Sequence, residues 1–259
     1  MSFLRSRSQL WSSRVVAALV IGLAGAAPAG QAAQAPLPTG AELIARHVAA
    51  IGGEAAFKGI KSMRVRGRFE LTAQAIGGDL EILTARPNRM LQRIDIPNVG
   101  RAETGYDGKI GWSIDPQAGP SLLTGRELSE LVDDAWFDGP LHAADHVREI
   151  SGVERVTFDQ RAAYKAKVIL TSGSDQVEYF DAETGWQIGM EGNRATSMGV
   201  LPTTTILRDY KKFGNLSMPT TLIQRAIGIE SALRVTSCEY DVVTSSAFDI
   251  PPQVKALIK

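Results

Sequence analysis

The sequence predicts a mainly β (α+β) fold, in which a curved antiparallel sheet is covered by an N-terminal helix and a mid-chain helical lid. Apolar and charged residues alternate along Met63–Leu71, the pattern of a strand with one buried face. Turn signals such as Tyr106–Lys109 and Ala182–Gly185 recur at short intervals, as in an antiparallel meander. Two threonine–glutamate pairs with capping-box spacing precede apolar residues at helical spacing, and these predict the covering helices.

The composition excludes several classes of protein. The chain has 259 residues, with 28 Lys+Arg and 28 Asp+Glu, so no basic excess indicates a nucleic-acid partner. Its one cysteine, Cys238, rules out an intramolecular disulfide and a cysteine-based zinc site. No apolar run reaches the roughly 20 residues that a stable membrane-spanning helix needs.

The N-terminal segment has the pattern of an export signal. Arg5, Arg7 and Arg14 form a basic region, and Val15–Ala27 is an apolar stretch of signal-peptide length. We therefore expect residues 1–35 to be a signal peptide with a short leader, cleaved near Ala29–Ala35, and residues 36–259 to form one periplasmic domain. An uncleaved amphipathic anchor is the alternative.

The domain is expected to open with a helix that begins at the Thr39/Glu42 capping box, presents Ile44, Val48 and Ile51 on one face and ends at Gly52-Gly53. A short helix follows over Glu54–Ile60. After the strand at 63–71, further strands are expected at Leu80–Leu83, Met90–Ile96, Val168–Leu170, Val177–Phe180, Thr203–Tyr210, Thr220–Ile227 and Leu233–Tyr240.

A helical island interrupts these strands between about Thr124 and Glu149. Thr124 and Glu127 have capping-box spacing, ahead of an apolar stripe made of Leu128, Leu131 and Val132. Pro140 opens a second short helix that runs to about Glu149, and a last short helix follows Pro251-Pro252. Because the island is the only long interruption, we expect it to be the lid, with glycines at 125 and 139 as flexing points.

Each group of side chains that could bind a metal or act in catalysis also has a simpler structural interpretation. His142 and His146 are four residues apart and could bind a metal, but no third ligand is identifiable, so a solvated helix face is preferred. Asp133, Asp134 and Asp138 could act in acid–base chemistry, and a surface role is preferred. No phosphate-binding loop or nucleophile elbow occurs, and no cofactor is expected.

Two further features of the sequence each have a functional and a structural interpretation. The arginine row on one strand face could bind anionic headgroups, and it consists of Arg64, Arg66 and Arg68. The preferred interpretation is that these arginines lie on a solvent-exposed outer face of the sheet. Cys238 lies in an alternating strand and is interpreted as a buried thiol rather than a nucleophile.

An apolar interior could bind a ligand. The candidate cavity residues come from the inner faces of the first strands, from Trp112 and from the island: Met63, Val65, Phe69, Leu80, Ile82, Met90, Ile94, Trp112, Leu128, Val132, Trp136 and Phe137. Any one of them is more often ordinary core, so a packed interior remains open.

Several segments together resemble an exported family of the LolA/LolB-like superfamily, described as outer-membrane lipoprotein-sorting-protein-like. They are Leu43–Ile60, Tyr106–Trp112 with Asp115-Pro116 and Leu123–Gly125, Tyr179–Gly185, Asp209-Tyr210 through Met218-Pro219, and Phe248 with Pro251. The resemblance implies a half-barrel that holds an apolar cavity under helices, and carriers that move lipoprotein acyl chains across the periplasm. No cysteine lies near the expected cleavage site, unlike in the lipid-anchored branch.

The leading hypothesis is a non-catalytic periplasmic carrier or binding protein whose partner is a lipid or lipoprotein acyl chain. An envelope protein-interaction module with a packed interior is the first alternative. A hydrolase with an unrecognised site is the second.

Overall fold

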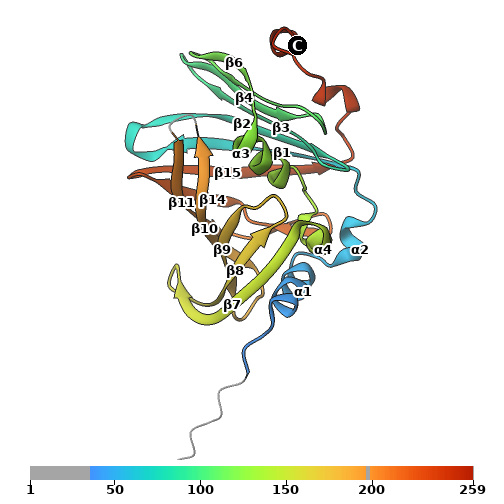
Figure 1. The fold of residues 1–259 in the computed structure, drawn as a ribbon, viewed down its shortest axis with the longest axis vertical. Coiled ribbons are helices and arrows are strands. Elements are labelled where there is room, and N and C mark those ends of the chain that lie inside the picture. Colours follow the sequence, from blue (N-terminus) through green and yellow to red (C-terminus); the bar gives the residue numbers. More distant parts are fainter. Residues whose placement is uncertain (1–35, 197–198, 259) are drawn as a thin grey trace, which may run out of the picture. The chain divides into compact units, whose positions relative to one another are not determined.

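The computed structural model describes residues 36–196 and 199–258, and the fold described below is that of the compact unit 37–259. The expected signal peptide at 1–35 lies outside the described residues. In the described part, one antiparallel sheet of 13 strands has the order β6-β5-β4-β3-β2-β1-β15-β14-β11-β10-β9-β8-β7. Figure 1 shows this order from β6 at the top to β7 at the bottom. The sheet is open, and the predicted mainly β fold is confirmed.

The strands are β1 (Ser62–Leu71), β2 (Ile76–Ala85), β3 (Arg89–Ile96), β4 (Gly100–Tyr106), β5 (Gly111–Asp115), β6 (Gly119–Leu122), β7 (Val147–Phe158), β8 (Arg161–Leu170), β9 (Asp175–Asp181), β10 (Gln187–Thr196), β11 (Gly199–Arg208), β12 (Lys211–Phe213), β13 (Leu216–Met218), β14 (Thr221–Ala226) and β15 (Ile229–Tyr240). The helices are α1 (Gly40–Ala50), α2 (Glu54–Phe57), α3 (Gly125–Asp134), α4 (Ala143–His146) and α5 (Pro252–Lys255), with 3-10 turns η1 (Thr72–Gln74), η2 (Gly139–His142) and η3 (Ser245–Phe248). No helix of the described residues is long and apolar enough to cross a membrane.

Most neighbouring strands are consecutive hairpins, and the pairing of β1 with β15 joins the two halves of the sheet. The register gives the sheet two faces, since paired residues in antiparallel strands point the same way. We call inner the face that carries Met63, Thr84, Met90 and Tyr106, which form one paired row across β1–β4. The opposite face is the outer face.

The predicted helical covers lie on the inner face. Leu43 of α1 packs on Ala166 and Phe180, and Leu131 of α3 packs on Tyr106. The capping box of α1 is confirmed, because the Glu42 amide donates to the Thr39 hydroxyl oxygen at 3.2 Å and the Glu42 carboxylate accepts from the Thr39 amide at 2.7 Å. These two helices cover part of the inner face without filling the space between themselves and the sheet.

The structure corrects the expected elements at several points. The second island helix ends at His146 rather than near Glu149, because Val147 already begins a strand that pairs with β8. Thr124 is the N-cap of α3, but its side chain makes no capping hydrogen bond. Strands β4–β7 and β10 were not expected at all. The C-terminal η3 and α5 are a further cover, whose Phe248 and Val254 pack on outer-face residues.

Candidate functional site

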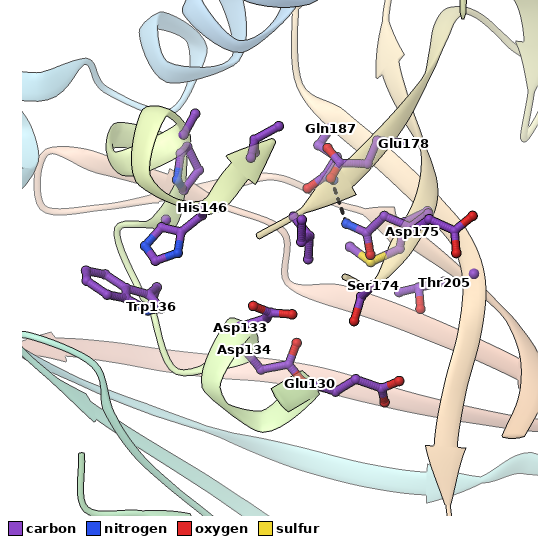
Figure 2. Close-up of a pocket in the computed structure, with 18 of the residues that line it drawn as sticks. Glu130, Asp133, Asp134, Trp136, His146, Ser174, Asp175, Glu178, Gln187 and Thr205 are labelled. Atoms are coloured by element: carbon purple, nitrogen blue, oxygen red, sulfur yellow. Dashed lines mark hydrogen bonds between the residues drawn. The ribbon is translucent and has the colours of Figure 1, made fainter. Parts of the chain in front are cut away.

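A cavity of about 350 Å³ lies under the helices on the C-terminal half of the inner face (Figure 2). Two paired rows of strand residues form its floor. The first row crosses four strands and consists of Glu178, Met190, Thr205 and Gln224. The second consists of Gln176, Gly192 and Thr203. The strand register therefore brings polar and apolar groups to one enclosed surface.

The roof of the cavity comes from three helical segments. Ile44 and His47 reach it from α1, Trp136 and His146 come from the island, and α3 supplies three acidic side chains. Figure 2 shows His146 and Trp136 on one side of the cavity, and Glu178 and Gln187 on the other. Phe180 adds an aromatic wall beside the floor.

Helix α3 docks through both of its faces. On its apolar face it approaches the sheet so closely that a Cβ atom built on Gly111 would lie 2.7 Å from a Leu128 methyl carbon, so a larger residue here would displace the Leu128 side chain. On its polar face, Glu130 is 5 % exposed. Its carboxylate accepts from the Arg126 side chain at 2.8 Å and from the Ala195 amide at 2.9 Å. Arg194 pairs with Asp134 and lies 3.8 Å from Glu130. These contacts join α3 to β10.

Two cavity carboxyl groups have only uncharged hydrogen-bond partners among the described residues. Asp133 accepts from the Ser172 hydroxyl at 2.7 Å, and Glu178 accepts from the Gln176 amide at 2.7 Å. Burial raises the pKa of both carboxyl groups, and these hydrogen bonds oppose the rise only in part. Both carboxyl groups therefore face the cavity in surroundings that disfavour their charged forms until a cation is near.

The island places an aromatic group at the cavity wall. The Trp136 ring lies 4.1 Å from the His146 ring and 5.3 Å from the His142 ring, measured between centroids. The Nε2 atom of His146 is buried and has no hydrogen-bond partner in the described structure. Burial, followed by the nearby His142, lowers the pKa of His146, so its imidazole is neutral at pH 7. A neutral ring with a free nitrogen therefore borders the cavity.

His47 closes the cavity beneath α1. Its Nδ1 accepts from the Gln187 amide at 3.2 Å, which fixes the proton on the other ring nitrogen. Burial lowers the pKa of His47 to about 4, opposed by a hydrogen bond with the Gly185 backbone. His47 is thus a neutral wall residue and not a cation.

A buried ion pair anchors the end of the island beside the cavity. Asp138 is fully buried and pairs with Arg86, whose guanidinium also donates to the carbonyl oxygens of Ile60 at 2.8 Å and Phe57 at 3.1 Å. His142 lies 3.2 Å from the same carboxylate. Asp138 therefore joins the island to α2 and to the turn after β2.

The twelve residues expected to line an apolar cavity are distributed over five places. Trp136 alone among them lines the cavity described above. Leu128 and Val132 pack with Met90 and Tyr106 under α3, and Phe137 packs with the cluster around Phe57 and lies against Arg86. The register puts Met63, Val65, Phe69, Leu80, Ile82 and Ile94 on the inner face of β1–β3.

Trp112 differs from the expectation of an inward-facing ring. It pairs with Gly105 and Leu122, one position out of step with inner-face Tyr106, so it points to the outer face. There it is fully buried with Leu91 and Phe248. Alternation along β5 is the physical reason.

The other candidate side chains from the sequence lie outside the cavity lining. Arg64, Arg66 and Arg68 lie on the outer face, each beside an acidic partner, as in the 2.7 Å Arg64–Glu239 contact. Cys238 is half-buried, and burial raises the pKa of its thiol. Within the described residues, no group of three or more His, Cys, Asp or Glu side chains is arranged to hold a metal ion.

The cavity is equipped for binding. No hydrogen bond among the described residues joins a cavity hydroxyl to His47 or His146, as nucleophilic catalysis by a serine or threonine would use. The sequence signal for the acidic wall was present at positions 130, 133 and 134, which share one helix face. Asp133 and Asp134 were expected at the surface because they lie at a helix end rich in solvent-facing residues, and Glu130 was not singled out.

Known structures share this fold. One is a domain from Vibrio parahaemolyticus described as an outer membrane lipoprotein-sorting protein domain, with 14 % identity, a TM-score of 0.57, and coverage of 81 % of this chain and 95 % of that one. A LolA superfamily protein from Nitrosomonas europaea has 14 % identity and a TM-score of 0.56 over 82 % of this chain and 99 % of that one. A DUF1329 family protein from Desulfovibrio piger has 13 % identity and a TM-score of 0.57, covering 81 % and 95 %. No family model and no curated protein matches the sequence. The chain is therefore structurally similar to the LolA superfamily.

Proposed function

We propose that this chain is a non-catalytic periplasmic carrier or binding protein for an apolar or amphiphilic molecule, such as the acyl chain of a lipid or lipoprotein. The observation that carries the proposal is the cavity of about 350 Å³ between the inner face and the helices. Its size is that of a small-molecule site, and it combines apolar walls with a few polar groups. The likeness to a lipoprotein-sorting domain is further support for carriage.

The apolar residues under α3 are a proposed extension of this site. Leu128 and Val132 now cover Met90 and Tyr106. If α3 lifts as a lid, these side chains would join the apolar inner face of β1–β3, where Val65 and Leu80 are 3 % and 2 % exposed. Gly125 adopts a φ of +54° at the start of α3 and Gly139 follows its end, so both are proposed as hinges.

Burial of a hydrocarbon chain supplies enough free energy for such a site. Each CH₂ group removed from water contributes about 0.8 kcal/mol, so a ten-carbon chain contributes roughly 8 kcal/mol before the costs of association. Those costs include separating α3 from the sheet, where Glu130 and Arg194 hold it.

Native mass spectrometry of protein released from the periplasm without detergent tests the proposal. We expect a non-covalent amphiphile on the protein, and an N-terminus between Gly30 and Leu37. Met190→Trp should remove the adduct, because Met190 lies in the cavity floor. Val177→Trp is the matched control, since Val177 alternates with Glu178 and faces outward, and it should keep the adduct.

Two results would contradict the proposal. One is a wild-type protein without any bound amphiphile that also takes up none from lipid vesicles. Such a protein would instead fit the packed interaction module. The other is an adduct that survives Met190→Trp unchanged, which would place the ligand elsewhere.

A further inference from the structure

We infer that the cavity selects amphiphiles whose polar head is a cationic ammonium group, and discriminates against anionic heads such as carboxylates. This inference rests on the proposed function, because it assumes that the cavity binds an amphiphile, and it adds the chemical class of the head. It depends on the charges that face the cavity, on their partners and on the aromatic wall.

The cavity wall has a strong excess of negative charge. Five carboxyl side chains line it, those of Glu130, Asp133, Asp134, Asp175 and Glu178, against one guanidinium, that of Arg194. The two histidines of the wall are neutral at pH 7 because burial lowers their pKa values. An anionic head entering this space would meet like charge from several elements.

Three of these carboxylates already have cationic partners. Glu130 pairs with Arg126 at 2.8 Å, Asp134 pairs with Arg194, and Asp175 lies 3.6 Å from Lys167. Asp133 and Glu178 have only uncharged hydrogen-bond partners, the Ser172 hydroxyl and glutamine side-chain amides, although Arg194 also attracts Asp133 through space. They belong to different walls, α3 and β9, so a cation in the cavity lies between two carboxyl groups that form no ion pair with a described residue (Figure 2).

A second observation, independent of the acidic residues, points to a head group that donates hydrogen bonds. The buried Nε2 of His146 has no partner in the described structure, although nearly all buried polar atoms have one. Because this atom is closed to the cavity, an ammonium N–H can donate to it only after the His146 ring turns toward the ligand, with the ring proton on Nδ1. The adjacent Trp136 ring adds a surface that attracts cations.

The rest of the cavity suits the hydrocarbon part. Ile44, Phe180 and Met190 line the same space as the carboxyls. An ammonium amphiphile therefore satisfies both kinds of wall at once, whereas a free inorganic cation leaves the apolar wall unused.

Calorimetric titration of the full-length protein at low ionic strength and pH 7 tests the inference with three probes of one chain length: decylamine, decanoate and 1-decanol. We expect decylamine to bind at least about tenfold more tightly than decanoate, since only the sign of the head charge differs. Glu178→Gln and Asp133→Asn should each weaken decylamine binding more than 1-decanol binding, so that the preference for decylamine over decanoate falls severalfold. Asp79→Asn is the matched control, because Asp79 pairs with Arg68 on the outer face.

The outcomes separate the two proposals. Decanoate that binds as tightly as decylamine overturns the head-group inference and leaves the carrier proposal standing. Failure of all three probes to bind overturns the carrier proposal itself. A preference for decylamine that survives both substitutions also overturns the inference, and circular dichroism shows whether each variant is folded.

Discussion

Removal of the Glu130 side chain tests whether this carboxylate holds α3 on the sheet. The side chain is 6 % exposed and its two oxygens accept from Arg126 and from the Ala195 amide. Glu130→Ala leaves that amide without its acceptor and takes the nearby carboxylate from Arg126 and Arg194, which keep the Asn193 carbonyl oxygen and the Asp134 carboxylate. Arg126 and Arg194 are 43 % and 37 % exposed, so water replaces part of what they lose.

The expected loss of stability follows from these contacts. A hydrogen bond to a charged group contributes about 1.5–3 kcal/mol when buried, and solvent screening reduces the arginine contribution, so we expect Glu130→Ala to cost about 2–3 kcal/mol. Glu130→Gln keeps one oxygen for the Ala195 amide and should cost about 1 kcal/mol. With an m-value of about 2–3 kcal/mol/M, the alanine variant loses about 1 M in its urea midpoint.

Urea unfolding followed by circular dichroism measures the midpoint, and hydrogen exchange of the α3 amides measures local opening. We expect those amides to exchange faster in Glu130→Ala than in Glu130→Gln, and a bound amphiphile to leave sooner. An unchanged midpoint together with unchanged α3 exchange in Glu130→Ala would refute the argument that Glu130 fastens the lid.

Three further changes have expected outcomes. The pKa of His47 is about 4 in the folded protein and near 6.5 in the unfolded chain, so the contribution of His47 to the free energy of unfolding is complete above pH 6.5. This contribution falls by about 3 kcal/mol as the pH drops to 4, because the unfolded chain then binds a proton that the folded protein does not. Urea titrations at each pH measure this decrease, and His47→Phe should remove it. Asp138→Asn should lower the free energy of unfolding by about 2–4 kcal/mol, because it leaves Arg86 without its buried carboxylate partner. A decrease no larger than that caused by a substitution at an exposed position would contradict this. Gly105→Ala puts a Cβ atom 2.2 Å from the Trp112 ring, so overpacking should lower the melting temperature at a cost of about 1–3 kcal/mol, and a wild-type melting curve would refute this.

Local sequence patterns were sufficient for part of the sheet and for the first helix. Strict alternation along Met63–Leu71 predicted β1, and the residues Tyr106–Lys109 predicted the turn that joins β4 and β5, although neither of those strands was expected. The Thr39/Glu42 pair predicted the start of α1, because a capping box uses only neighbouring residues. Such signals depend on backbone geometry within a few residues, so they can be interpreted without knowing the tertiary fold.

The cavity could not be located in this way, because it depends on which face of each strand points inward. In β9, Val177 and Tyr179 occupy the outer face, where Tyr179 stacks on Phe158 at 3.9 Å, while Gln176 and Glu178 point inward. A rule that apolar residues face the core assigns this strand the wrong way round. The polar face of α3 was misjudged for the same reason, since it covers a cavity and not solvent.

The most direct test of the account is whether the head of a ligand touches Trp136 in the cavity. Decylamine with a nitroxide group attached at its nitrogen quenches the fluorescence of a tryptophan that its head contacts. We predict saturable quenching in the wild type that is lost in Trp136→Phe and kept in Trp186→Phe, since Trp186 stacks on Tyr210 and does not line the cavity. Quenching that persists in full in Trp136→Phe, or none in the wild type when calorimetry shows binding, would contradict the claim that this cavity is the ligand site.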